Sequence, residues 1–169
     1  MIEVIVILSV FIFIAALVII YFLVSRNLKS YKIKIDEAEF LLNELLNEKY
    51  DLLVSIEYII TSETDVDNKV FTNLKSIKKQ NISTFDFDKK LVENYDLIKK
   101  IKDDYSEISK NQEFNKIGKD IYNLDEKLEA TKTFYNKYVE VLNNLINKFP
   151  IKIVAKTQRL EEKKCYEIR

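Results

Sequence analysis

The segment VIVILSVFIFIAALVIIYFLV, residues 4–24, holds no charged side chain, and Ser9 is its only clearly polar residue. A helix rises about 1.5 Å per residue, so a segment of this length spans the roughly 30 Å hydrocarbon core of a bilayer. Many of its residues are β-branched, but in lipid a single segment satisfies its backbone N–H and C=O groups only as a helix. The sequence therefore predicts a transmembrane helix over residues 4–24.

A cleaved signal peptide is the main alternative for this segment. Such a peptide has a basic start, a shorter apolar core and small residues before the cleavage point. Here no basic residue precedes the run, and the small pair Ala15–Ala16 lies in its middle. These features favour a retained anchor, with residues 1–3 as a short extracytoplasmic N-terminus.

Basic residues follow the predicted anchor directly, at Arg26, Lys29, Lys32 and Lys34. Positively charged flanks stay on the cytoplasmic side of a membrane. The sequence therefore predicts a single-pass protein with its N-terminus outside and residues 25–169 in the cytoplasm. The same four side chains can also contact anionic lipid, although topology alone accounts for them.

The rest of the chain predicts helices, because it holds one glycine and one proline in 169 residues. Turns that need positive φ are then rare, which disfavours a many-stranded β fold. We expect an all-α fold, in which the transmembrane helix precedes an antiparallel bundle of three to four long helices. The bundle is predicted over residues 25–150, and a C-terminal tail over residues 151–169.

The first bundle helix is predicted from about residue 27 to residue 60, and no breaker separates it from the anchor. Its apolar residues repeat every seven positions, as in coiled coils, although Lys49 interrupts the first of the two registers. These registers are Leu28, Ile35, Leu42 and Ile56, and Tyr31, Ala38, Leu45, Leu52 and Ile59. The polar segment TSETDVDN ends this helix.

A short apolar segment and a further helix come next. The break between them is NISTFDF, which offers Ser83 or Asp86 as an N-cap. The turn that follows the further helix is SKNQEF, where Ser109 and Gln112 have the spacing of a capping box.

The last helix has the most regular pattern, which predicts coiled-coil packing over about 50 Å. Its two registers are Phe114, Ile121, Leu128, Tyr135, Leu142 and Phe149, and Ile117, Leu124, Thr131, Tyr138 and Leu145. Proline lacks an N–H and disfavours a helical residue before it, so this helix should end at or near Phe149. In the tail we expect Ile151 and Ile153 to pack back in an extended piece, and QRLEEKKC can add one or two helical turns.

Composition argues against most catalytic chemistry. Dinucleotide and P-loop sites need several glycines, and triads and most zinc or di-iron sites use histidine, which the chain lacks. Lys+Arg and Asp+Glu balance at 27 each, which argues against a nucleic-acid footprint. We therefore expect no catalytic residue, no cofactor, no metal ion and no nucleic-acid partner.

Catalysis by paired carboxylates needs neither glycine nor histidine, so the acidic pairs are the remaining candidate catalytic residues. They are Asp65/Asp67, Asp86/Asp88, Asp103/Asp104 and Glu161/Glu162. Most lie in predicted turns or beside lysines, as solvated charges do, and no calcium-binding loop with a central glycine is present. An enzyme or enzyme subunit acting on an acidic or peptide substrate stays as a remaining hypothesis.

The residues between 105 and 155 include a characteristic series of aromatic, polar and apolar positions. These are Tyr105, Asn111, Phe114, Glu126, Tyr135, Asn136, Asn143, Phe149, Pro150 and Ala155. In their order and spacing this run resembles the LemA family of bacterial membrane proteins. Upstream, EKYDLLVSIEYI is similar to another family stretch, with Val54 and Ser55 where the family has proline and asparagine. The tail departs from the family, because it is rich in lysine rather than in glycine and phenylalanine.

The resemblance implies an antiparallel helical bundle at a bacterial inner membrane, in a family without established enzymatic activity. Our main hypothesis is a non-enzymatic scaffold or interaction module with unknown protein partners, held in the lipid bilayer through residues 4–24. The alternative is a homo-oligomer that senses or remodels the membrane by self-association. The candidate partner-binding residues are Asn111, Phe114, Tyr135, Asn136, Asn143, Phe149 and Pro150.

Two of these candidates, Asn136 and Asn143, lie one heptad apart beside the apolar seam. Their amides can hydrogen-bond to neighbouring helices and fix their register, which would make them structural. They can equally form a polar stripe that is exposed for a partner. Both interpretations stay open from the sequence.

Overall fold

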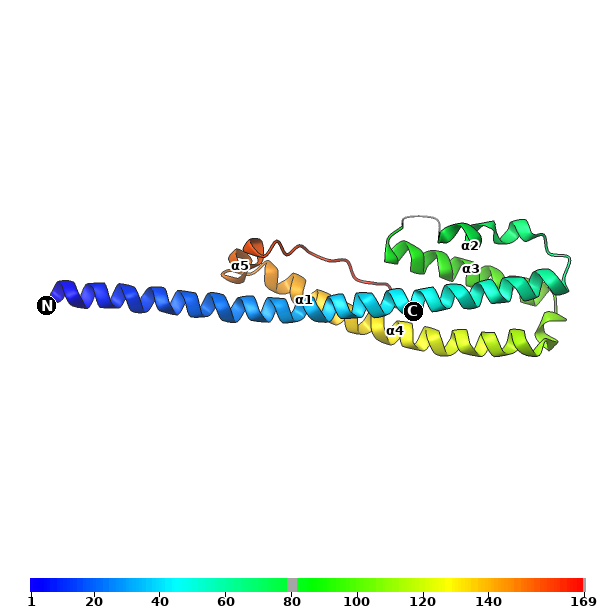
Figure 1. Ribbon diagram of the computed structural model, residues 1–169, viewed down its shortest axis with the longest axis horizontal. Helices are drawn as coiled ribbons and strands as arrows, with labels where there is room; N and C mark the ends of the chain where they lie inside the picture. Colours follow the sequence, from blue (N-terminus) through cyan, green and yellow to red (C-terminus); the bar gives the residue numbers. More distant parts are fainter. Residues whose placement is uncertain (79–81, 169) are drawn as a thin grey trace. The chain divides into compact units, whose positions relative to one another are not determined.

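The computed structural model describes residues 1–78 and 82–168, and every regular element in these ranges is a helix. This confirms the predicted all-α class (Figure 1). The elements are α1 (Ile2–Glu63), the 3-10 helix η1 (Asn68–Phe71), α2 (Thr72–Ile77), α3 (Thr84–Asp104), the 3-10 helix η2 (Ile108–Lys110), α4 (Gln112–Ile146) and α5 (Ile151–Thr157).

The predicted anchor and the first bundle helix form one helix, α1, of 62 residues. No glycine or proline interrupts it, so the backbone hydrogen bonds continue from the apolar run into the bundle. Residues 1–23 are exposed throughout. Within the described ranges, α1 is the one helix that is long and apolar enough to cross a membrane.

The chain forms two compact units, and both α1 and α4 contribute to each of them. Unit 1 combines Met1–Ala38 with Phe134–Cys165. Unit 2 combines Glu39–Thr133 with the end of the chain from Tyr166.

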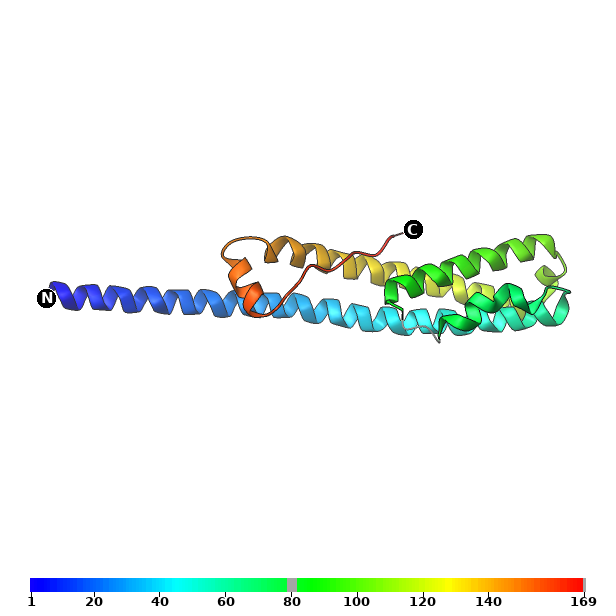
Figure 2. The same cartoon turned by 90° about the horizontal axis from the view of Figure 1, so that it is seen from above.

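In unit 2, α1, α2, α3 and α4 run in alternating directions, each antiparallel to the next (Figures 1 and 2). The predicted heptad positions of α1 point inward here, since Leu42 and Ile56 are buried. Lys49, which interrupts that register in the sequence, is buried as well. The apolar core of unit 2 includes Leu42, Leu46, Leu53, Ile60, Phe71, Leu74, Leu91, Ile98, Ile121, Leu124 and Leu128.

The starts of α3 and α4 are both capped by polar side chains. The Ser83 hydroxyl accepts the backbone N–H of Asp86 at 3.2 Å, so the predicted cap and break are confirmed, although Asn81 lies outside the described residues. The capping box predicted at Ser109 and Gln112 is wrong. Ser109 belongs to η2, and Asn111 Oδ1 instead accepts the N–H of Phe114 at 2.9 Å.

The buried face of α4 changes position along the helix. The register of Leu128, Tyr135 and Leu142 stays buried, as predicted. In the second register the buried residues beyond Thr131 are Val139 and Ile146, while Tyr138 and Leu145 are only half-buried. A straight helix drifts by about 20° per heptad from a strict seven-residue repeat, so after several heptads the inward position moves on by one residue.

The end of the last predicted helix also differs from expectation. Because α4 ends at Ile146, the phenylalanine at the last heptad position lies beyond the helix. Phe149 is 83% exposed, so its prediction as a core residue is wrong.

In unit 1, the C-terminal tail forms a helix where an extended piece was expected. This helix, α5, buries Val154 and Ala155 and leaves Ile153 exposed. It ends at Thr157 and is followed by Arg159, which has φ of 53°. The Leu160 N–H donates to the Ala155 carbonyl at 3.0 Å, as in a Schellman motif. Residues 160–168 carry no regular structure, so the helical turns expected in QRLEEKKC are absent.

Candidate functional site

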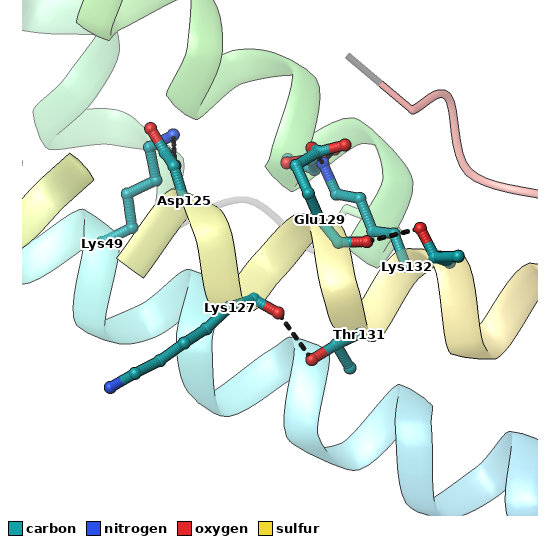
Figure 3. Close-up of polar contacts among 8 residues, drawn as sticks. Lys49, Asp125, Lys127, Glu129, Thr131 and Lys132 are labelled. Carbon is teal, nitrogen blue, oxygen red and sulfur yellow. Dashed lines mark hydrogen bonds and ion pairs between the residues drawn. The ribbon is translucent and has the colours of Figure 1, made fainter. Parts of the chain in front are cut away.

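Two lysines carry positive charge into the helical core of unit 2 (Figure 3). Lys49 of α1 and Lys132 of α4 are each only 3% exposed. Lys49 Nζ lies 2.5 Å from Asp125 Oδ1, within α4. Lys132 Nζ lies 2.8 Å from Asp88 Oδ2 of α3 and 3.1 Å from Glu129 Oε1. The four-carbon stems pack among apolar side chains while the ammonium groups meet carboxylates.

One of the acidic pairs from the sequence takes part in this lysine–carboxylate cluster. Asp86 accepts a hydrogen bond from the Ser83 hydroxyl at the start of α3, as a capping residue does. Asp88 lies further into α3, and its side chain is only 15% exposed. Its expected role as a solvated charge is therefore wrong, because the helix turns it toward Lys132.

Tyr95 of α3 lines the same small pocket as the residues of this cluster. Burial, followed by the charge of Asp125, raises the pKa of Tyr95, so its phenol stays protonated at neutral pH. Lys49 Nζ and Lys99 Nζ lie 5.4 and 4.9 Å from the centre of its ring. Through its ion pairs the cluster joins α1, α3 and α4.

An open groove of about 700 Å³ lies beside the cluster, between α3 and α4. Its apolar lining comes from three buried residues, Ile56, Ile98 and Phe114. Its cationic lining comes from Lys99, Lys102 and Lys119. The volume is in the range of about 300–1,000 Å³ that is common for ligand sites.

The chain's only glycine, Gly118, also lines this groove. Glycine inside a helix costs about 1 kcal/mol relative to alanine. A Cβ atom at this position would meet nothing within 4 Å, so the packing of the fold does not require glycine here. The missing side chain leaves the backbone of α4 open to close approach by a molecule in the groove.

Two of the sequence candidates, Asn111 and Phe114, lie at the start of α4 and serve the fold of unit 2. Asn111 caps the helix through Phe114 N–H, and its amide donates to Glu63 Oε1 at the end of α1. Phe114 is buried and forms part of the apolar lining of the groove.

In unit 1, Asn143 binds the chain's own tail. Its Nδ2 donates to the Lys163 carbonyl at 2.8 Å, and its Oδ1 accepts the Lys163 N–H at 3.1 Å. This two-bond pairing satisfies the backbone of a tail segment that has no regular structure. Tyr135 is buried and Asn136 is half-buried. A partner-binding role for these residues stays a prediction.

The other candidates of unit 1 lie at its surface. Phe149 and Pro150 form an exposed turn between α4 and α5. Of the basic flank, Arg26, Lys29 and Lys32 are exposed. Lys34 instead lies against Tyr138, with its Nζ 3.3 Å from the hydroxyl.

The groove and the buried lysines were missed in the sequence, although two signals pointed to them. Lys49 occupies a core heptad position, and a lone glycine stands in the middle of the strongest helix pattern. Lys132 gave no comparable signal, because it lies beside the register rather than in it.

Comparison with known proteins places most of the chain in one family. The model described as "LemA family" matches residues 42–169, which include nearly all of unit 2 and the tail. Searches of curated proteins and of solved structures gave no match.

Proposed function

The chain belongs to the LemA family, and on this premise we propose that it is a non-enzymatic interaction module anchored at the inner face of a bacterial membrane. The observation that carries the proposal is the continuity of α1. One helix begins as an exposed apolar segment and continues as a core element of unit 2. A bilayer covers the apolar part of such a helix and leaves the bundle beside the membrane.

The basic flank sets the proposed orientation. Arg26, Lys29 and Lys32 follow the apolar segment and are exposed, where they can meet the cytoplasmic leaflet. The N-terminus then lies outside, and both the groove and the lysine–carboxylate cluster face the cytoplasm.

The groove beside Gly118 is the proposed interaction surface. Its buried apolar lining suits an apolar side chain, and its lysines suit carboxylates. Lys102 and Lys119 form no ion pair within the described ranges of the chain. We therefore assign the groove to a peptide segment of a partner protein that carries both acidic and apolar residues.

A photocrosslinking experiment tests this proposal in native membranes. A photoreactive phenylalanine analogue replaces Tyr122, which lines the groove, or Tyr58, which is an exposed tyrosine elsewhere in unit 2. We expect an adduct from position 122 and none from position 58, and mass spectrometry should identify an acidic, apolar segment. Lys102→Glu with Lys119→Glu should abolish the adduct.

Equal adducts from both positions, or an adduct that survives the two charge reversals, would contradict the groove as the binding surface. An adduct with a second copy of this chain would support the alternative function, self-association at the membrane.

A further inference from the structure

We propose that the turn after α4 together with α5, residues 147–159, forms a second membrane contact that lies on the bilayer surface and binds anionic lipid headgroups. This inference rests on the proposed anchoring through α1, and it assigns a lipid-binding surface to a segment that follows the chain's only proline.

α5 lies against the end of the apolar run of α1. Tyr21, inside the apolar run of α1, has its hydroxyl 3.3 Å from Thr157 Oγ1. Ser25, just after that run, accepts a hydrogen bond from Gln158 Nε2 at 2.5 Å. Both views show α5 beside this part of α1 (Figures 1 and 2). If residues 4–24 span the bilayer, α5 therefore lies at the boundary between hydrocarbon and headgroups.

The segment exposes apolar side chains on its outward face. Val154 and Ala155 face inward and are buried, while Ile153 on the same short helix is 56% exposed. The turn before it presents Phe149, which is 83% exposed. Apolar side chains at the membrane boundary can insert beside the headgroups and leave water. The outward face of this segment therefore matches a lipid surface.

The segment is also basic. From residue 141 to residue 160 the chain holds no Asp or Glu, but it holds Lys148, Lys152, Lys156 and Arg159. All four of these side chains are exposed. Arg26 and Lys29 lie on α1 close to its contact with α5 and are exposed too. Basic residues near an anionic leaflet are attracted to it.

The turn is also held in place by the tail. Asn147 Nδ2 donates to Glu162 Oε1 and to the Asn143 carbonyl, so the turn is tied at its start. Glu162, one of the two acidic residues that follow the segment most closely, is engaged in this tie. A fixed turn presents Phe149 in one direction, which lowers the entropy cost of its insertion.

Tryptophan fluorescence provides the test, because the natural chain holds no tryptophan. The full chain is placed in nanodiscs that contain lipids brominated near the headgroup, with or without phosphatidylglycerol. We expect Phe149→Trp to be quenched several-fold more than Tyr58→Trp, an exposed control in unit 2. The excess should grow with phosphatidylglycerol and fall when Lys148, Lys152 and Lys156 are replaced by glutamate.

Phe11→Trp, inside the apolar segment, separates this inference from the proposed anchoring. Its quenching by lipids brominated deep in the chain reports insertion of α1. If Phe11→Trp is quenched while Phe149→Trp matches the Tyr58→Trp control, the second contact is wrong and the anchor stands. If Phe11→Trp is not quenched, the anchoring fails and the inference falls with it.

Discussion

At the scale of single residues, the distinctive feature of unit 2 is that Lys49 and Lys132 are buried with carboxylate partners. Taking a lysine out of water has a high free-energy cost, and the partner carboxylate offsets it. Replacing both members of such a pair with apolar residues is often neutral, whereas removing only one leaves an uncompensated charge. Removing one member of a pair should therefore destabilise the fold more than replacing both members with apolar residues.

Asp125→Asn is expected to lower the free energy of unfolding of unit 2 by about 3 kcal/mol. This is the lower end of the usual range for such a change, because 35% of the Asp125 side chain is exposed. Asp120→Asn, at an exposed position of the same helix, is the matched control and should change little. Urea unfolding of the full chain in detergent, followed by circular dichroism, measures the difference.

The double variant Lys49→Met with Asp125→Asn should recover most of the lost stability, since no buried charge is then left without a partner. If Asp125→Asn unfolds at the same urea concentration as Asp120→Asn, the pair does not stabilise the fold.

At the scale of elements, the tail depends on α4 through Asn143. The paired hydrogen bonds to Lys163 hold a segment that has no helix of its own. The amide of Asn143 thus binds the chain's own backbone rather than a neighbouring helix, and its partner-binding role stays a prediction.

Asn143→Ala should therefore release residues 160–165 while α4 stays folded. Hydrogen–deuterium exchange of the full chain is expected to show about a tenfold faster exchange at the Lys163 amide, since one lost hydrogen bond corresponds to roughly 1.4 kcal/mol. Asn144→Ala, at the neighbouring exposed position, is the control and should leave that amide protected. Equal exchange in the two variants would show that Asn143 does not hold the tail.

Some features of the helices could be predicted from the sequence, and others could not. The heptads of α1 predicted its buried face, and Ser83 predicted the start of α3, because periodicity and capping are local properties. The later part of α4 could not be predicted in the same way, because the strict repeat does not include the drift of a straight helix. The helical form of α5 depends on burying Val154 and Ala155, which is a tertiary contact.

The candidate site was less predictable than the fold. Lys49 was visible as an interruption, but its partner Asp125 lies 76 residues away, and no local pattern joins the two. In the sequence, the single glycine, Gly118, served only to exclude glycine-rich phosphate-binding motifs. Its meaning comes from the open space around its backbone, which exists only once α3 and α4 are packed.

At the scale of the whole molecule, the proposed function requires that α1 begins in lipid and ends in the bundle. Membership of the LemA family and the apolar segment agree with this arrangement. The direction in which the chain crosses the membrane decides whether the groove meets cytoplasmic partners, and so it decides the proposed function.

The chain's only cysteine, Cys165, gives a direct test of that direction, because it is exposed and lies in the tail. Partial burial, with a smaller effect of Glu140, raises the pKa of this thiol, which slows its reaction with a maleimide at neutral pH. A membrane-impermeant maleimide is added to right-side-out vesicles of the native membrane, before and after they are opened with detergent. A variant with Cys165→Ser and Glu3→Cys reports the opposite side.

The account predicts that Cys165 is labelled only after the vesicles are opened, that the cysteine at position 3 is labelled before, and that the protein stays in the membrane after a carbonate wash. Labelling of Cys165 in closed vesicles, or release of the protein by the wash, would contradict a cytoplasmic module anchored by α1.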